Sequence, residues 1–155
     1  MVDRKKEWKN AGVRVVRKDQ LDGNTPSTPG MDRMAAITAQ SANAQKLWAG
    51  TVTIQPNAKT GAHHHGELES IIYVLAGKAK MRWGDNLEFV AYAEAGDFIF
   101  VPPFVPHQEL NASEEERLHC ILVRSDQDPI VVNLAIASVD EPEEVIWRDP
   151  HHPAP

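Results

Sequence analysis

A histidine-rich segment near the middle of the chain has residue types and a spacing suited to binding a metal ion. Residues 61–69 read Gly-Ala-His-His-His-Gly-Glu-Leu-Glu and hold three of the seven histidines. In an extended backbone, successive side chains point to opposite faces, so His63 and His65 share a face and His64 points away from it. Two imidazoles on one face can chelate one ion, and imidazole with carboxylate suits zinc, iron, manganese, nickel or copper.

The same segment has a simpler interpretation, which is a solvated loop that binds metal only adventitiously. A second segment favours a built site. Residues 97–101 follow the turn at Gly96, have apolar residues on both faces and predict a buried strand. Prolines then stiffen the backbone before His107. This arrangement could hold His107 rigidly against a distant partner, as a preorganised metal ligand requires.

The elements that must position these residues are strands. Short apolar or alternating runs recur about every ten residues, with glycine, proline, asparagine or aspartate between them, and this spacing is typical of an all-β sandwich or barrel. No convincing long amphipathic helix is found, and 35–46 is the only ambiguous stretch. The runs cover residues 31–37, 47–55, 70–76, 79–83, 87–93, 97–101, 118–124 and 130–137.

The length of 155 residues suits one domain with flanking segments. We expect an irregular N-terminal arm over 1–30, with one short strand at most around residues 13–16, and a barrel over 31–140. Residues 141–155 are rich in proline, acid and histidine, so we expect a C-terminal segment that ends as a loose tail.

Composition restricts the partners and the setting. Lysine and arginine total 16 against 22 acidic residues, and this net charge of −6 without a basic stripe argues against nucleic acid or an anionic membrane as partner. No apolar run is long enough to span a bilayer. A single cysteine, Cys120, excludes an internal disulfide, and the charged N-terminus has no signal-peptide core. We therefore expect a cytoplasmic protein with a structural, unreactive Cys120.

At this point the sequence resembles the cupin superfamily over about residues 47–123. The first cupin signature has two histidines separated by one residue, then a glutamate and a glycine, and His63, His65, Glu69 and Gly77 follow this order. The second signature has a glycine, a proline, a histidine and an asparagine. It is matched by Gly96, Pro102, His107 and Asn111, with Phe104 in place of an inner glycine.

The fourth ligand is where the sequence departs from the pattern. Seven residues separate Glu69 from Gly77 instead of six, so a strict count places Ser70 at the glutamate position. We predict Glu69 as the fourth ligand and as the catalytic carboxylate, because a local bulge would absorb one residue. The alternative is a site of three histidines with Ser70 at the fourth position.

The resemblance implies a small antiparallel double-sheet β-barrel of the jelly-roll type, with one divalent ion (iron, manganese, nickel or zinc) held by His63, His65, Glu69 and His107. It implies a metal-dependent enzyme that acts on a small organic molecule, with dioxygenase chemistry as the leading hypothesis. The alternatives are a metal-dependent isomerase, decarboxylase or lyase, and a non-catalytic ligand-binding or sensing protein. We expect a homodimer, since cupins often pair through their edges.

Overall fold

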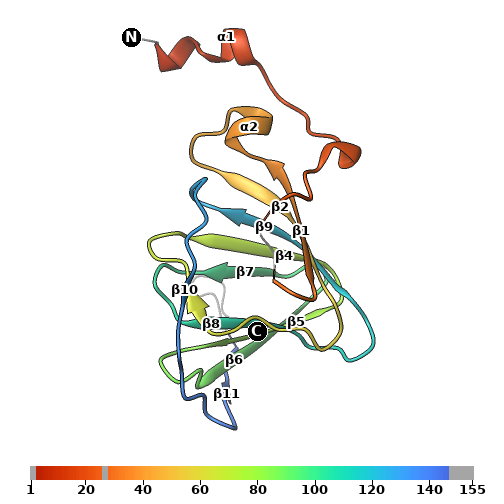
Figure 1. The fold of residues 1–155 in the computed structure, drawn as a ribbon, viewed down its shortest axis with the longest axis vertical. Helices are drawn as coiled ribbons and strands as arrows, with labels where there is room; N and C mark the ends of the chain where they lie inside the picture. The colour runs from red at the N-terminus through yellow and green to blue at the C-terminus, as the bar shows by residue number, and fades with distance from the viewer. Residues whose placement is uncertain (1–2, 26–27, 147–155) are drawn as a thin grey trace, which may run out of the picture.

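Two β-sheets packed against each other make up most of the structure, a computed structural model that describes residues 3–25 and 28–146 (Figure 1). The five-stranded sheet has the order β1 (Met31–Ile37), β2 (Trp48–Ile54), β9 (Leu118–Arg124), β4 (Ser70–Ala76) and β7 (Phe98–Val101). The six-stranded sheet has the order β10 (Val132–Asn133), β3 (His63–His64), β8 (His107–Asn111), β5 (Lys78–Trp83), β6 (Phe89–Glu94) and β11 (Glu143–Glu144). The pairing is antiparallel except between β11 and β6.

The core lies between the two sheets and follows from strict alternation along the strands. In β2, every second residue from Trp48 to Ile54 is buried, while the residues between them are less buried. Val52, Val74 and Leu118 from the five-stranded sheet belong to the same buried cluster as Ala79 and Met81 from the six-stranded sheet. Removal of this apolar surface from water is the main force that holds the sheets together.

Two glycines that the sequence placed in the cupin signatures have conformational reasons to be glycine. Gly77 and Gly96 have φ angles of +90° and +98°, a region that other residues rarely adopt. A Cβ on Gly77 would also lie 2.6 Å from the carbonyl oxygen of Arg117. Asn111 is buried, and its amide donates hydrogen bonds to the carbonyl oxygens of Ile54 and Glu116. These three signature residues therefore shape turns and brace the barrel.

The predicted fold class is confirmed, and most predicted runs become strands. The strand predicted to be buried at residues 97–101 differs from this expectation. It forms β7, which lies at a sheet edge, and Phe98 is 73% exposed. Strands β3 and β8 are absent from the predicted apolar runs because, apart from Leu110, their residues are polar. The ambiguous stretch 35–46 contains the end of β1 and the short helix α2 (Ala39–Ala42).

The described part of the N-terminal arm contains short helical elements, η1 (Arg4–Lys6), α1 (Trp8–Ala11) and η2 (Lys18–Gln20). Residues 13–16 do not form a strand, and Val13 and Val15 are exposed. At the C-terminal side, β11 adds to the edge of the six-stranded sheet. The predicted loose tail lies largely outside the described residues, since 147–155 are not among them.

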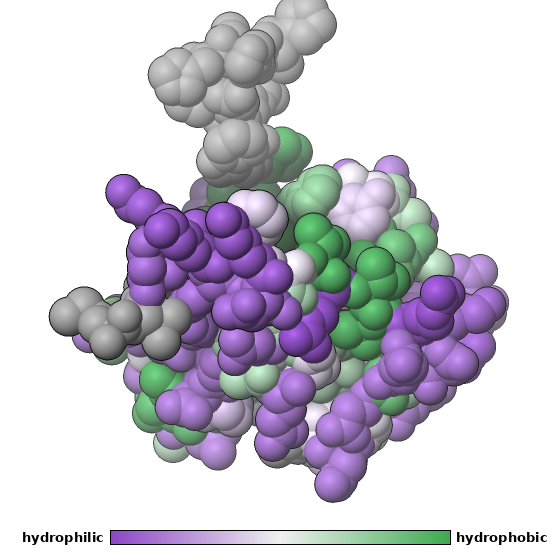
Figure 2. Space-filling model, turned by 90° about the horizontal axis from the view of Figure 1, so that it is seen from above, coloured by the Kyte–Doolittle hydropathy of each residue, from purple (hydrophilic) through white to green (hydrophobic). Residues whose placement is uncertain are grey.

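The face seen from above is mostly hydrophilic, and its largest group of hydrophobic residues lies to the right of the centre in Figure 2. Within the described residues, none of the helices has the length and apolar character needed to cross a membrane.

Candidate metal centre

Three histidines and one glutamate converge between neighbouring strands of the six-stranded sheet. His63 lies in β3 directly opposite His107 in β8, and His65 follows β3 by one residue. Glu109 lies two residues after His107 on the same face of β8. The ligand atoms of His63, His65, His107 and Glu109 all lie within 4.8 Å of one another, and no other such group occurs in the part of the chain that the structure describes.

Backbone carbonyl groups fix the orientation of all three imidazoles. The Nδ1 atoms of His63, His65 and His107 lie 2.7, 2.8 and 3.0 Å from the carbonyl oxygens of Gly61, Ile130 and Val105, respectively. A carbonyl oxygen only accepts hydrogen bonds, so each Nδ1 carries the proton. The second nitrogen of each ring, Nε2, is then left as the potential ligand atom, which is the orientation that metal-binding histidines commonly show.

The group fits a metal ion because one of its polar atoms is buried without a partner. The Nε2 atom of His107 makes no hydrogen bond among the described residues, although the residue is only 2% exposed. The Glu109 carboxylate is 3.8 Å away, which is too far for a hydrogen bond but close enough for an ion pair. A buried polar atom without a partner is costly, and a cation between these side chains would satisfy it.

Burial and neighbouring charges shift the pKa values of the four side chains in different directions. Burial lowers the pKa of His63, and it lowers the pKa of His65 to about 4. Burial acts in the same direction on His107, but the adjacent Glu109 carboxylate outweighs it and raises the pKa of His107. Burial opposes ionisation of Glu109, yet His107 and the other two histidines lower its pKa to about 2. The neutral form is therefore favoured for His63 and His65, and the protonated form is favoured for His107 beside the Glu109 carboxylate.

Glu69, which the sequence predicted as the fourth ligand, does not lie in this group. Its side chain is exposed, and its backbone N–H donates to the hydroxyl of Ser125. The next residue, Ser70, begins β4 and is buried on the face shared with Ile72 and Val74. Strand alternation thus gives Glu69 the outward position and Ser70 the inward one, with no bulge to exchange them.

The carboxylate of the cluster is Glu109, which the sequence reasoning missed. A signal was available, because a glutamate two residues after a ligand histidine lies on the same face of a strand. Alternation along the strand also explains His64, which points to the face opposite His63 and His65. Its ring lies outside the cluster near Phe104, and its Nδ1 accepts a hydrogen bond from the backbone N–H of Gly66.

Two other side chains with potentially reactive groups, those of His119 and Cys120, lie outside the cluster. His119 contacts Thr53 on the neighbouring strand, with Nδ1 and Oγ1 2.8 Å apart. Cys120 is buried, and burial raises the pKa of its thiol to about 12. A thiol with this pKa is almost entirely uncharged at neutral pH and is a poor nucleophile.

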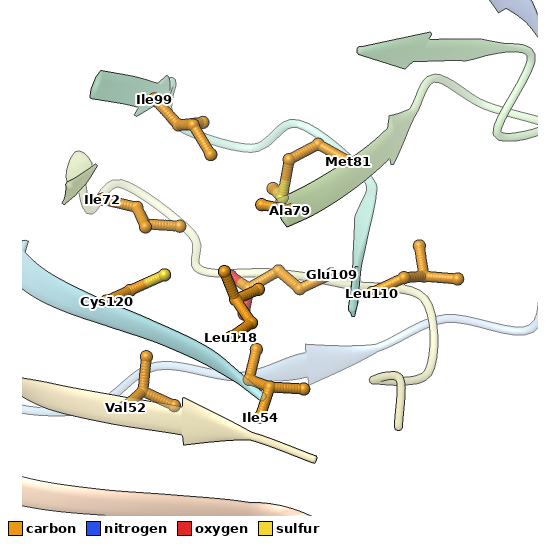
Figure 3. A pocket seen from close by; sticks show the side chains of 10 residues that line it. All are labelled: Val52, Ile54, Ile72, Ala79, Met81, Ile99, Glu109, Leu110, Leu118 and Cys120. Atoms are coloured by element: carbon orange, nitrogen blue, oxygen red, sulfur yellow. The ribbon is translucent and has the colours of Figure 1, made fainter. Parts of the chain in front are cut away.

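The cluster opens onto a cavity of about 190 Å³ between the two sheets. The wall opposite the histidines is formed by the five-stranded sheet and includes Arg33, Ser70 and Arg124. A smaller apolar cavity of about 20 Å³ lies deeper in the barrel, and Glu109 is the one charged residue that lines it (Figure 3). The aliphatic part of Glu109 therefore packs in the core, which restricts the positions its carboxylate can take.

The structure combines a double-sheet β-barrel with a histidine and glutamate cluster beside a cavity, which is the arrangement of a β-barrel protein with a candidate metal site. The family model described as the cupin domain matches residues 50–124, the part of the chain that supplies all four residues of the cluster. This match covers both signature segments, and the predicted resemblance to the cupin superfamily is confirmed.

Solved structures with the same fold include oxalate decarboxylase from Bacillus subtilis, with 22% identity and a TM-score of 0.59. The match covers 70% of this chain but only 29% of the decarboxylase. KdgF from Halomonas sp. has 20% identity and a TM-score of 0.59, with 75% and 96% of the two chains covered.

A Klebsiella pneumoniae protein with a double-stranded β-helix domain has 17% identity and a TM-score of 0.60, with 79% and 98% of the two chains covered. At these identities the likeness shows the fold alone. No curated protein matches the chain.

The geometry predicts different outcomes for the three consecutive histidines. His64→Ala should keep the metal content of the unmodified protein, because its ring lies outside the cluster. His63→Ala, His65→Ala and His107→Ala should each weaken binding by about 100-fold or more, beyond the usual effect of residues that only orient a ligand. Elemental analysis and titration with Mn²⁺ or Zn²⁺ measure this. Equal losses from all three consecutive histidines would indicate a flexible histidine tract instead.

The site also predicts how metal affinity depends on pH. His65, with a pKa of about 4, is already neutral well below pH 6, and burial also lowers the pKa of His63. In contrast, the raised pKa of His107 keeps that ring protonated beyond the ordinary value of 6.5. A metal must displace this proton, so affinity should rise with pH until the pKa of His107 is passed. Calorimetry in buffers of different ionisation enthalpy should detect close to one proton released per ion on the acid side of that pKa. Release of three protons near pH 6 would contradict the assignment, because His65 should already be neutral there.

Proposed function

We propose that this protein is a metal-dependent enzyme that acts on a small organic molecule, with dioxygenase chemistry as the leading hypothesis. The observation that carries the proposal is the convergence of three oriented imidazoles and a carboxylate beside an internal cavity. Four protein ligands leave positions open on a five- or six-coordinate ion, and open positions distinguish catalytic metal sites from structural ones.

In this proposal His63, His65, His107 and Glu109 hold the ion, and Glu109 takes the place that the sequence gave to Glu69. A bound divalent ion would supply Lewis-acid or redox chemistry to oxygen atoms of the substrate. The protein's own contribution is to hold the imidazoles through the carbonyl groups of Gly61, Ile130 and Val105. Iron, manganese, nickel and zinc all suit this ligand set.

Decarboxylase, isomerase or lyase chemistry is the second candidate. It is supported by the fold shared with the Bacillus subtilis oxalate decarboxylase, whose Mn(II) centres have been characterised. Activity assays separate dioxygenase from decarboxylase chemistry. The protein is loaded with Fe²⁺ or Mn²⁺, and oxygen consumption and carbon dioxide release are measured against a panel of catechols, diketones and small acids. Metal-dependent binding without turnover across the panel would identify a sensing protein.

We also propose a homodimer in a reducing cytoplasm. The support for the dimer is an apolar patch on β4 and β7, which consists of the exposed residues Ile71, Phe98 and Phe100 and the partly exposed Tyr73. The register places Ile71 opposite Phe100 and Tyr73 opposite Phe98, and β7 is an edge strand. Exposed apolar patches often mark protein interfaces. The cytoplasmic setting is supported by the lone, buried Cys120.

The two glutamates provide a direct test of the ligand assignment. Glu109→Gln removes the charge of the proposed ligand while keeping its shape, so affinity for Mn²⁺ should fall by about tenfold or more, and turnover should fall with it. Glu69→Gln is the matched control, and it should leave both unchanged because its side chain is exposed.

Circular dichroism and thermal unfolding of both glutamate variants establish that the barrel is intact. Metal loss in Glu69→Gln with Glu109→Gln unaffected would overturn the assignment. Normal metal content with abolished turnover in Glu109→Gln would make Glu109 a base and leave three histidines as the protein ligands.

The patch predicts a change of mass in solution. Phe98→Ser and Phe100→Ser together should convert a dimer to a monomer, since they remove the two most exposed aromatic side chains of the patch. Light scattering after size-exclusion chromatography measures this. Tyr92→Ser, which alters an exposed aromatic residue on β6, is the control and should leave the mass unchanged. A monomeric unmodified protein would exclude the dimer.

A further inference from the structure

The cavity beside the cluster has a strongly basic wall. Arg33 on β1 and Arg124 at the end of β9 both line it, on the five-stranded sheet that faces the histidines. The two guanidinium groups are close enough to affect each other electrostatically, and Arg33 also contributes to the lowered pKa of His63. The cavity therefore has cationic groups on one side and metal-binding groups on the other.

Arg33 has a buried donor that no protein group satisfies. Its Nε atom is inaccessible to solvent and has no hydrogen-bond partner among the described residues. Arginine stays protonated in proteins, so this N–H always requires an acceptor. An unsatisfied buried donor costs about 1 to 3 kcal/mol, and more when the group is charged. A ligand bound in the cavity could accept this hydrogen bond and so remove the cost.

Arg124 is held by the protein in a way that Arg33 is not. Its Nε and Nη2 donate to the carbonyl oxygens of Asp126 and Gln127, at 3.3 and 3.1 Å. Its guanidinium also lies over the ring of Trp48, 4.1 Å from the ring centroid. These contacts fix Arg124 as a second positive charge in the wall and leave Arg33 as the group with an open donor.

Acidic side chains do not neutralise this wall. Glu109 is the only carboxylate among the residues that line the cavity, and it pairs with His107. Asp126 and Asp128 affect the pKa of Arg124, but neither forms an ion pair with it among the described residues. The remaining polar residues of the lining, which include Thr60, Ser70 and Asn133, are neutral.

We propose that the cavity selects a small organic acid, with a carboxylate of the ligand bound by Arg33 and the rest of the molecule directed toward the histidine cluster. The guanidinium presents a planar set of donors that matches a carboxylate in two parallel hydrogen bonds. The volume of about 190 Å³ has room for about six water molecules, so the acid must be small. This inference names the substrate class of the function proposed above and rests on that function.

Binding of acids and of matched neutral molecules tests the proposal separately from catalysis. Malonate and succinate should bind to protein loaded with Mn²⁺, and malonamide and succinamide, which lack the charge, should bind at least tenfold more weakly. Arg33→Gln should weaken binding of both acids by at least tenfold while leaving the Mn²⁺ content unchanged. Arg117→Gln, which alters an exposed arginine of the barrel, should match the unmodified protein. Calorimetry measures affinity, and elemental analysis measures metal.

Arg33→Lys keeps the charge but loses the planar donors, so its affinity for the acids should lie between those of the unmodified protein and Arg33→Gln. It also serves if Arg33→Gln does not fold. The proposal fails if acids bind as tightly to the Arg33 variants as to the unmodified protein, because the metal alone would then hold them. It also fails if the neutral amides bind equally well. Acid binding that depends on Arg33 without turnover would sustain this inference and overturn the proposed enzymatic function.

Discussion

The pairing of His63 with His107 across β3 and β8 is the contact on which the whole site depends. It places two imidazoles from distant parts of the chain side by side, with ring centroids 4.4 Å apart. Strand alternation then determines the rest, because His65 and Glu109 each lie two residues beyond a member of this pair and so face the same way. A shift of one residue in this register would turn these side chains away from the cavity.

The negative charge of the cluster comes from Glu109, whereas the first cupin signature would place it at Glu69. The carboxylate of the cluster lies on β8, between His107 and Asn111 of the second signature, and is not the glutamate of the first signature. One consequence is that the Glu109 carboxylate lies 3.8 Å from Nε2 of His107, where it raises the pKa of the histidine, while the histidine lowers the pKa of the glutamate. A second consequence is that Ser70, at the inward position of β4, leaves the opposite side of the cavity without a negative charge.

The two sheets therefore contribute different chemistry to one cavity. The six-stranded sheet provides the histidines and Glu109, and the five-stranded sheet provides Arg33 and Arg124. Apolar side chains such as Val101 and Leu122 complete the lining. Charges interact more strongly in a partly enclosed space than in bulk water, so an anionic ligand between the sheets would interact with both walls.

The sequence by itself determined the fold class and the histidines that meet, because both depend on local patterns. Recurring apolar runs predict the sheets, and the separation of His63 from His65 by one residue predicts their common face, with His64 opposite. It did not determine the carboxylate. Glu69 and Ser70 are adjacent, and only the pairing of β4 with β7 and β9 decides which of them points inward. Arg33 lies far from the signatures in the sequence, and only the packing of the two sheets brings it to the cavity. The physical reason is that alternation along one strand is a local property, whereas register and sheet packing depend on contacts between residues far apart in the chain.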